Sequence, residues 1–329
     1  MNGNADSTLG DGYGFQCPAG PLAQKTALLQ LARALKNQRY HFVTVTPATH
    51  ACVNSRPGNE WAIDLHGIFG WSRPFQLSIV PKEILNLMQA AKIITPCRYG
   101  WKSLLRVSTI KDHLFFHSAF PTAESDAVFL GPDTCRFVNA IESHLSISKT
   151  TLRRVVDVGC GAGPGAITVA LCNPEAKILA VDINDGALLL TSINAALAGV
   201  DNVLPLYSDL LNDVKGQFDL IVANPPYLLD PAQRAYRHGG GLLGSGLSYA
   251  IVEAALGRLT PGGTLVLYTG VAIVGGIDLF RLNVEQKLRK SSATWCYSEV
   301  DPDVFGEELL SEAYRDADRI AAILLTITR

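Results

Sequence analysis

Long apolar runs are missing from this sequence of 329 residues. No uninterrupted apolar stretch reaches the roughly eighteen residues that a membrane-spanning helix needs, so we expect none. The first residues, MNGNADSTLGDGYGFQ, lack the basic segment followed by an apolar segment that is typical of a signal peptide. We therefore expect no signal peptide and interpret residues 1–20 as a flexible tail.

Cysteine pairs at metal-binding spacing are also missing. The seven cysteines are scattered, odd in number and never arranged as CxxC. This pattern argues against a disulfide framework and against a zinc site, and we expect no bound metal. It favours reduced thiols in a cytoplasmic protein. Cys160 lies in a glycine-rich loop, where we interpret it as a small packing residue and not as a nucleophile.

The net charge is small, but the charges are unevenly spread. The chain holds 28 lysines and arginines and 30 aspartates and glutamates, which leaves a net charge of −2. Residues 1–117 hold twelve basic and six acidic side chains, whereas residues 118–329 hold sixteen and twenty-four. The basic part either meets an acidic partner or is attracted to the acidic part of the same chain.

Residues 21–120 predict a small N-terminal α+β domain. Apolar residues recur at helical spacing in two segments, and two others read as strands. The expected elements are helices at 21–37 and 81–95, a strand at 41–48, and a hairpin at 104–119 that turns near Lys111 and Asp112. We predict a linker at 121–134 and a catalytic domain over residues 121–329.

The second domain alternates strands with helices. The expected strands are 153–159, 176–184, 202–209, 218–224, 264–270, 293–300 and 320–327, and the expected helices are 164–173, 185–199 and 245–263, with Gly199 as a C-cap. This alternation predicts an α/β fold with a mainly parallel sheet that is covered on both faces. In such sheets a ligand binds beyond the carboxyl ends of the strands.

Glycines follow the first of these strands in VVDVGCGAGPG. Gly159, Gly161 and Gly163 allow a tight turn and a close approach of the backbone to a ligand. The loop fits either a dinucleotide, whose phosphates bind at the helix N-terminus, or S-adenosylmethionine, which has no phosphates. Asp157 favours S-adenosylmethionine, because a carboxylate there repels a pyrophosphate but suits the ammonium group of the methionyl portion.

Two more carboxylates end the next strands. Asp182 is placed to accept hydrogen bonds from ribose hydroxyls of either cofactor, and Asp209 to accept one from an adenine amine. A lone aspartate at a strand end is as often a capping or solvated residue. Three aspartates at consecutive strand ends indicate a cofactor site.

The fourth strand ends in Asn224-Pro225-Pro226-Tyr227, which cannot continue a sheet comfortably. The motif suits methyl transfer to a planar, conjugated nitrogen. The Asn224 side-chain oxygen and the Pro225 carbonyl would hold the two N–H bonds and turn the lone pair toward the methyl group. Tyr227 would stack on a flat amide or base. Without the glycine loop, a proline-terminated surface turn would be the better interpretation.

On these motifs, residues 121–329 resemble a class I S-adenosylmethionine-dependent methyltransferase, and NPPY is similar to that of the HemK-type protein-glutamine methyltransferases. VFLGPDT is similar to the V-Y-E-P-x-x-D-T lead-in of some HemK relatives, and HGGGLLGSGLSY to their glycine-rich segment after NPPY. The resemblance implies a Rossmann-like fold whose mostly parallel seven-stranded sheet has an antiparallel last strand. It implies S-adenosylmethionine as cofactor, bound by Thr134, Asp157, Gly159, Gly161, Gly163, Asp182, Asp209 and Asn224, with the target nitrogen at Asn224, Pro225 and Tyr227.

Two departures leave the acceptor open: the Arg-Pro-Glu-Thr-Glu lead-in is missing, and the N-terminal domain, the expected substrate-recognition domain, is not a helical bundle. A protein glutamine ranks first. A nucleic-acid base is possible but not favoured, with Arg98, Lys102, Arg106 and Lys111 as phosphate contacts. A small amine, amide or guanidine is the third acceptor, drawn by Asp301, Asp303, Glu307 and Glu308. A catalytically idle partner-binding subunit and a nicotinamide-dependent dehydrogenase fit the motifs less well.

Overall fold

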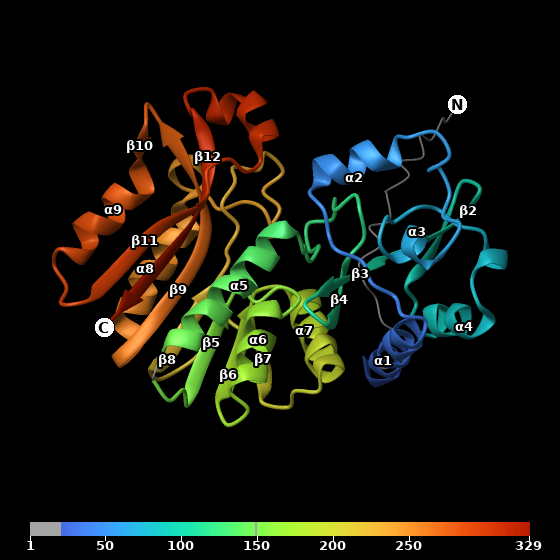
Figure 1. Cartoon of the computed structure of the whole chain (residues 1–329), viewed down its shortest axis with the longest axis horizontal. Helices are drawn as coiled ribbons and strands as arrows, with labels where there is room; N and C mark the ends of the chain where they lie inside the picture. The colour runs from blue at the N-terminus through green and yellow to red at the C-terminus, as the bar shows by residue number, and fades with distance from the viewer. Residues whose placement is uncertain (1–20, 149) are drawn as a thin grey trace, which may run out of the picture.

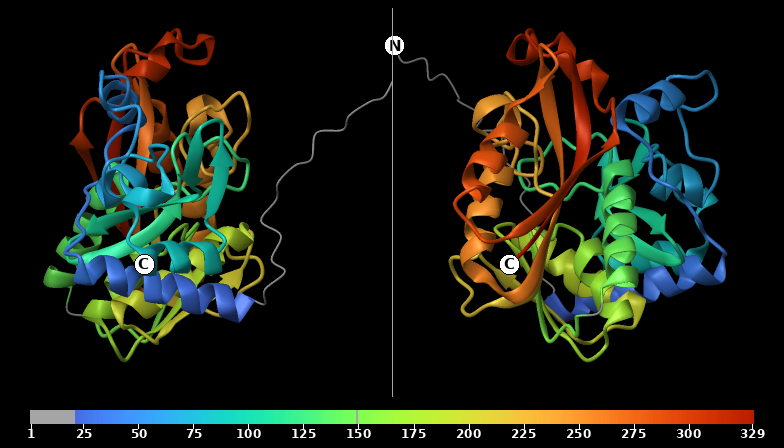
Figure 2. Two further views of the ribbon diagram at one scale, coloured as in Figure 1. Left: turned by 90° about the vertical axis from the view of Figure 1, so that its right-hand side faces the viewer. Right: turned by 60° about the vertical axis from the view of Figure 1, so that its left-hand side comes forward.

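A sheet of eight strands organises the C-terminal part of the chain in the computed structural model, which describes residues 21–148 and 150–329. The expected tail at 1–20 lies outside the described residues. Figures 1 and 2 show the sheet and its helices on one side of the molecule and the N-terminal elements on the other. No helix in the described residues is long and apolar enough to cross a membrane.

The sheet has the strand order β11-β12-β9-β8-β5-β6-β7, with the short β10 paired to β9. Its strands are β5 (Arg154–Val158), β6 (Lys177–Asp182), β7 (Val203–Tyr207), β8 (Phe218–Ala223), β9 (Leu259–Val274), β10 (Ile277–Asp278), β11 (Thr294–Asp301) and β12 (Arg319–Thr328). Neighbours from β7 to β9 pair in parallel, whereas β12 is antiparallel to both β9 and β11. This confirms the predicted mostly parallel sheet with an antiparallel last strand.

Helices cover both faces of the sheet, because successive residues of a strand point to opposite sides. Val155 of β5 packs in one apolar cluster with α5 and α6, and Val156 packs in another with α8 and α9. The helices of this part are α5 (Pro132–Ile147), α6 (Pro164–Cys172), α7 (Asp185–Ala198), α8 (Gly246–Arg258) and α9 (Leu279–Leu288), with short 3-10 turns η2 (Leu242–Gly244), η3 (Gly306–Leu310) and η4 (Glu312–Tyr314). Gly199 ends α7 in the left-handed conformation, as predicted.

The N-terminal part mixes helices with two hairpins. Its elements are α1 (Pro21–Asn37), α2 (Pro47–Asn54), α3 (Leu65–Phe69), η1 (Leu77–Ile79), α4 (Lys82–Ala90), β1 (Ile94–Cys97), β2 (Gly100–Ser103), β3 (Leu105–Ile110) and β4 (His113–Ser118). The hairpin predicted at 104–119 is confirmed by the β3–β4 pairing. The predicted helix at 81–95 ends early, at Ala90, and its last residues enter β1.

The strand predicted at 41–48 was wrong. The chain there is extended but pairs with β3 only at Phe42, which exchanges hydrogen bonds with Thr109. Helix α2 then starts at Pro47, because the Thr46 side chain caps the N–H of Thr49 and proline suits the first helical turn.

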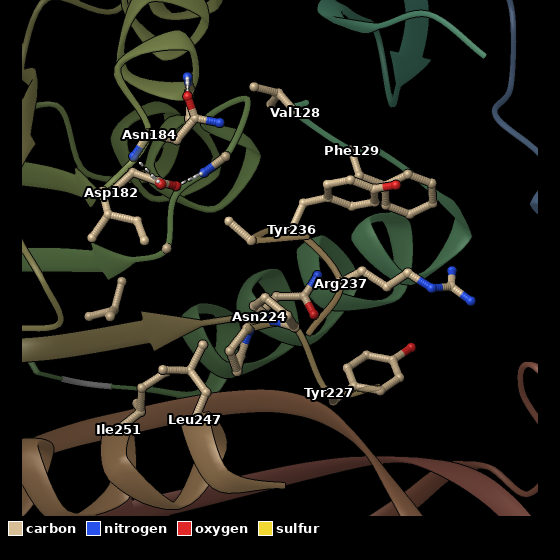
Figure 3. Close-up of a pocket in the computed structure, with 18 of the residues that line it drawn as sticks. Val128, Phe129, Asp182, Asn184, Asn224, Tyr227, Tyr236, Arg237, Leu247 and Ile251 are labelled. Carbon is tan, nitrogen blue, oxygen red and sulfur yellow. Dashed lines mark hydrogen bonds between the residues drawn. The ribbon is translucent and has the colours of Figure 1, made fainter. Parts of the chain in front are cut away.

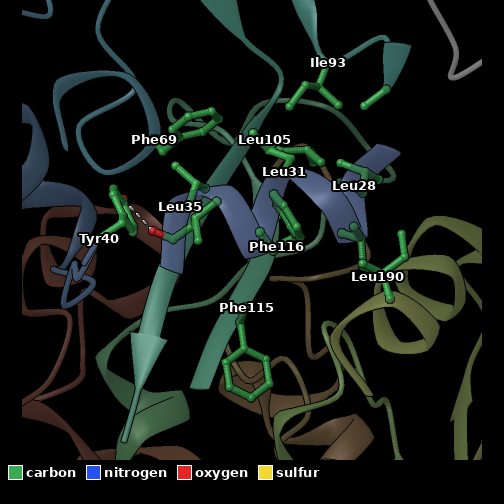
Figure 4. Close-up of a cluster of buried hydrophobic side chains, with 14 of the residues drawn as sticks. Leu28, Leu31, Leu35, Tyr40, Phe69, Ile93, Leu105, Phe115, Phe116 and Leu190 are labelled. Atoms are coloured by element: carbon green, nitrogen blue, oxygen red, sulfur yellow. Dashed lines mark hydrogen bonds between the residues drawn. The ribbon is translucent and has the colours of Figure 1, made fainter. Parts of the chain in front are cut away.

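The two parts of the chain meet at α7. Leu28, Leu31 and Leu35 of α1 belong to the same buried cluster as Leu190 of α7 (Figure 4). The Asn194 side chain of α7 accepts a hydrogen bond from Phe116 N at 2.9 Å and donates to the Phe116 and Ala162 carbonyls. It therefore ties the β3–β4 hairpin to the glycine loop.

Candidate active site

A cavity of about 210 Å³ opens at the carboxyl ends of β5, β6, β7 and β8 (Figure 3). Of the residues predicted from the sequence, the structure brings eight to its wall: Thr134, Gly159, Gly161, Asp182, Asp209, Asn224, Pro225 and Tyr227. Asp157 and Gly163 do not line it. Among the described residues, no group of three or more His, Cys, Asp or Glu side chains is arranged to hold a metal ion.

The glycine loop presents bare backbone to the cavity. Gly159 and Gly161 have φ angles of +69° and +55°, and a Cβ on either would meet no atom within 4 Å. Both glycines are thus needed for conformation, and the space beside them is open to a ligand. Gly163 differs, because a Cβ there would lie 2.9 Å from the Thr191 side chain. Gly163 allows α7 to pack closely and does not face the cavity.

Asp157 lies behind the loop. It is 1% exposed, and its Oδ2 accepts a hydrogen bond from Ala166 N at 2.8 Å, in the first turn of α6. Burial raises its pKa to about 7, and the nearby Asp182 carboxylate adds to the shift. The structure therefore places this carboxyl group where it holds the start of α6, out of direct reach of a cofactor.

Asp182 sits at the end of β6 with both oxygens held. Oδ2 accepts from Gly161 N at 2.9 Å and Oδ1 from Asn184 N at 3.0 Å. Burial raises the pKa of Asp182, against these backbone hydrogen bonds. Each carboxylate oxygen accepts more than one hydrogen bond, so room remains for two hydroxyls. Asn184, which was not predicted, also lines the cavity and donates to the Asp126 carbonyl at 2.6 Å, fixing the linker beside this site.

Asn224 points its amide into the middle of the cavity (Figure 3). Neither its side chain nor the Pro225 carbonyl has a hydrogen-bond partner elsewhere in the described residues. Asp209 also reaches the cavity. Its backbone N–H donates to Asp213 at 3.2 Å and its carbonyl accepts from Asn212 N at 3.0 Å, whereas its side-chain carboxylate has no hydrogen-bond partner among the described residues.

The glycine-rich segment at 238–249 packs directly on the backbone of the NPPY turn. A Cβ on Gly244, whose φ is +87°, would lie 2.1 Å from the Tyr227 carbonyl oxygen, and one on Gly239 2.6 Å from the Pro226 carbonyl oxygen. Hydrogen bonds from Leu228 N to the Arg237 carbonyl and from Gly239 N to the Leu228 carbonyl close the contact. The turn is thus held in one geometry by backbone that only glycine permits.

The Tyr227 side chain is held from the other direction. Its hydroxyl donates to Asp133, which also accepts from Tyr268 at 2.8 Å and from Arg136 at 2.9 Å. Burial, with the Asp133 carboxylate, raises the pKa of Tyr227 well above its ordinary value. Gly270 packs directly against the ring, since a Cβ there would lie 2.2 Å from it. Tyr227 is 7% exposed, which leaves little of its ring for the predicted stacking.

Asp133 was not predicted, although it stands next to Thr134 in the quoted lead-in. Its position in the first turn of α5 places the carboxylate at a helix N-terminus, which stabilises negative charge. Thr134 caps the same turn by accepting from Gly131 N at 3.3 Å. The lead-in thus supplies both a cavity-wall residue and an anchor for Tyr227.

Aromatic and charged side chains form the wall beyond Asn224. Phe129 and Tyr236 stack with ring centroids 6.0 Å apart, near Arg237 (Figure 3). Of the acidic residues expected to attract a cation, Glu308 pairs with Arg237, and Asp301 with Arg136 at 2.7 Å. These two carboxylates are neutralised within the chain, which weakens that expectation.

The wall suits S-adenosylmethionine. The bare loop at Gly159 and Gly161 leaves room for its methionyl portion, and the Asp182 carboxylate offers acceptors for its ribose. The cavity-lining carboxylates Asp182 and Asp209, which no arginine or lysine of the described residues pairs with, complement its positively charged sulfonium and ammonium groups.

Comparison with known proteins agrees with this assignment. The family model described as "Methyltransferase small domain" matches residues 139–272. The release factor glutamine methyltransferase of Deinococcus radiodurans is 32% identical over 206 residues, which are 59% of this chain and 69% of that protein. The ribosomal RNA small subunit methyltransferase C of Mannheimia succiniciproducens is 37% identical over 127 residues, but these are 37% of this chain and 33% of that protein.

Solved structures match more loosely. TYW2 of M. jannaschii in complex with AdoMet covers 71% of this chain and 91% of its own, with 14% identity and a TM-score of 0.47. The Deinococcus enzyme, which is 32% identical and matched over 69% of its length, places the chain in its family. With S-adenosylmethionine as its cofactor, the chain belongs to the class I methyltransferases, in the family of the release factor glutamine methyltransferases.

Proposed function

We propose that this enzyme methylates the side-chain amide nitrogen of a glutamine in a protein. The observation that carries the proposal is a pair of free acceptors, the Asn224 side-chain oxygen and the Pro225 carbonyl, on a rigid turn in the cavity wall. An amide nitrogen carries two N–H bonds that match two such acceptors. The Deinococcus relative, a release factor glutamine methyltransferase, supports this choice of acceptor.

In this mechanism the chain orients the amide and does not act as an acid or a base. S-adenosylmethionine, when bound, supplies an electrophilic methyl group. Asn224 and Pro225 hold the two N–H bonds, so that the nitrogen lone pair is turned toward the cofactor side of the cavity. Asn224 is neutral and takes no proton, so the proton that the nitrogen loses when the N–CH3 bond replaces one N–H bond passes to water. The Gly244 backbone and the Tyr227 contact to Asp133 fix the turn, which lowers the cost of reaching the reactive geometry.

An exocyclic amine of an RNA base is the second candidate, favoured by the similarity to ribosomal RNA small subunit methyltransferase C. The basic residues expected to bind phosphates do not support it. Arg106 is buried and donates to the Gly70 carbonyl, and Lys111 pairs with Glu142 at 3.0 Å. Of the four residues predicted to contact phosphates, Arg98 and Lys102 remain available for that role.

The N-terminal residues 21–120 remain our proposal for the substrate-recognition domain, with residues 121–329 as the catalytic domain. The hydrogen bonds of Asn194 to both Phe116 and Ala162 give that domain a direct connection to the glycine loop. A cytoplasmic location stays a prediction from the cysteine pattern.

The test uses S-adenosylmethionine with a tritiated methyl group and an extract of the source organism, with Asn224→Ala as the negative control. We expect label in the protein fraction that acid hydrolysis releases as methylamine, because hydrolysis of an N-methylated glutamine amide gives glutamate and methylamine. Label in protein that stays on an amino acid after hydrolysis would contradict a glutamine acceptor. Label in RNA would establish the second candidate instead.

A further inference from the structure

Arg237 stands out on the cavity wall. It is the single positively charged side chain among the described residues that line the cavity, beside three carboxylates, Asp133, Asp182 and Asp209. It belongs to the wall beyond Asn224, its guanidinium group extends away from Asn224 (Figure 3), and its side chain is 20% exposed. Its backbone is fixed close to the NPPY turn, since its carbonyl accepts from Leu228 N at 3.2 Å.

The guanidinium group of Arg237 is only partly engaged. Nη2 donates to Glu308, and Nε lies 3.8 Å from Asp230. Nη1 has no hydrogen-bond partner anywhere in the described residues. A guanidinium group is planar, so the contacts of Nη2 and Nε fix the direction in which the two N–H bonds of Nη1 point.

The charge around Arg237 is already balanced. Arg234 binds Asp230 through two of its nitrogens, at 2.6 and 2.8 Å, so that two arginines face Asp230 and Glu308. A second anion brought to Nη1 would meet the repulsion of these two carboxylates, whereas a neutral oxygen would not. The adjoining wall of Phe129, Tyr236 and Phe305 is aromatic and offers no further cation.

We infer that Arg237 Nη1 donates a hydrogen bond to a main-chain carbonyl of the acceptor, and that Arg237 thereby selects a neutral peptide segment over a phosphate-bearing one. The inference rests on the proposed function and goes further, because it names a residue that reads the chain around the target glutamine. Carbonyl groups on either side of a glutamine are neutral, regularly spaced and strong acceptors, whereas a nucleic acid offers charged phosphates.

The test compares Arg237→Gln with Arg234→Gln, using a recombinant release factor as the acceptor. Arg234 lies in the same loop and also binds Asp230, but it does not line the cavity. We expect Arg237→Gln to lower kcat/KM for the release factor about tenfold or more, mainly through KM, because a hydrogen bond from a charged group is lost. We expect Arg234→Gln to lower it less than about threefold, and both variants to bind S-adenosylmethionine as the wild type does.

Salt distinguishes the two kinds of partner. A contact to a neutral carbonyl predicts that the ratio of wild-type to Arg237→Gln activity stays constant from about 50 to 300 mM KCl, since screening acts on pairs of charges. A ratio that collapses with salt, or equal losses in both variants, would overturn the inference while methylation of the release factor still stood. If Arg237→Gln does not fold, Arg237→Lys replaces it, because lysine keeps the charge and loses the planar fork. A wild type that labels RNA and no protein would instead refute the proposed function itself.

Discussion

The buried carboxyl group of Asp157 makes one defined contribution to the pH dependence of this protein's stability. Its pKa is raised to about 7 by burial, from an ordinary value of 3.8. The folded protein therefore keeps this proton up to about pH 7, whereas the unfolded chain loses it near pH 4. The stabilisation that the protonated Asp157 gives the folded state is fully present below pH 4, decreases as the pH rises, and is lost above about pH 7. Three pKa units correspond to about 4 kcal/mol of unfolding free energy, about 3 kcal/mol of it between pH 5 and 8.

Asp157→Asn tests this reasoning. Asparagine keeps an oxygen for Ala166 N and does not titrate, so we expect the variant to gain about 3 kcal/mol relative to the wild type between pH 5 and 8. Urea unfolding without cofactor at both pH values measures the difference. Asp219→Asn is the control, because burial raises the pKa of Asp219 but hydrogen bonds from Arg153 and Arg154 lower it overall. Asp219 is ionised in both states in this range. Parallel pH profiles for the wild type and Asp157→Asn would refute the reasoning.

Three further predictions concern the NPPY turn. Asn224→Ala should bind S-adenosylmethionine normally by calorimetry and lose about a hundredfold or more in kcat, because the substitution removes only the contact to the amide that receives the methyl group. Wild-type turnover of the variant would rule that contact out. Gly244→Ala and Gly58→Ala share φ strain of about 1–2 kcal/mol, at +87° and +86°, but nothing lies within 4 Å of a Cβ on Gly58. Gly244→Ala, but not Gly58→Ala, should lose about 1–3 kcal/mol more of its unfolding free energy, measured with urea, and most of its turnover. Equal losses in the two variants would contradict the close packing of Gly244 on the Tyr227 carbonyl. Tyr227→Phe and Tyr268→Phe each remove a hydroxyl that donates to the Asp133 carboxylate, so both should lower the free energy of unfolding by about 1–3 kcal/mol. The value of kcat should fall mainly in Tyr227→Phe. Equal kcat values in the two variants would argue against a role of Tyr227 in positioning the turn.

The alternation of strands and helices in the catalytic part could be predicted from the sequence, because local patterns of residues specify these elements. Strands buried on both faces are continuous apolar runs, and glycine or proline marks where helices end. Residues at the carboxyl ends of parallel strands meet at one edge, so Asp182, Asp209 and Asn224 were brought together in prediction and in the structure.

The N-terminal part was less readable, because tertiary contacts decide its local structure. The residues at 41–46 have strand-like composition, yet pairing stops after the contact of Phe42 with Thr109. The basic group at 98–111 looked continuous along the chain. In the folded chain, Arg106 is buried and Lys111 pairs with Glu142. Glu142 belongs to α5, a helix that was not predicted from the sequence.

The glycines show most clearly where sequence reasoning ends. Gly159, Gly161 and Gly163 alternate in one loop and all have positive φ, so their spacing alone predicts the same role for all three. What distinguishes them is the space beside each: open cavity at the first two, and the Thr191 side chain of α7 at the third. That difference depends on where a helix thirty residues away packs, which no local pattern encodes. A loop motif therefore identifies the ligand-binding region, while tertiary packing decides which of its residues a ligand meets.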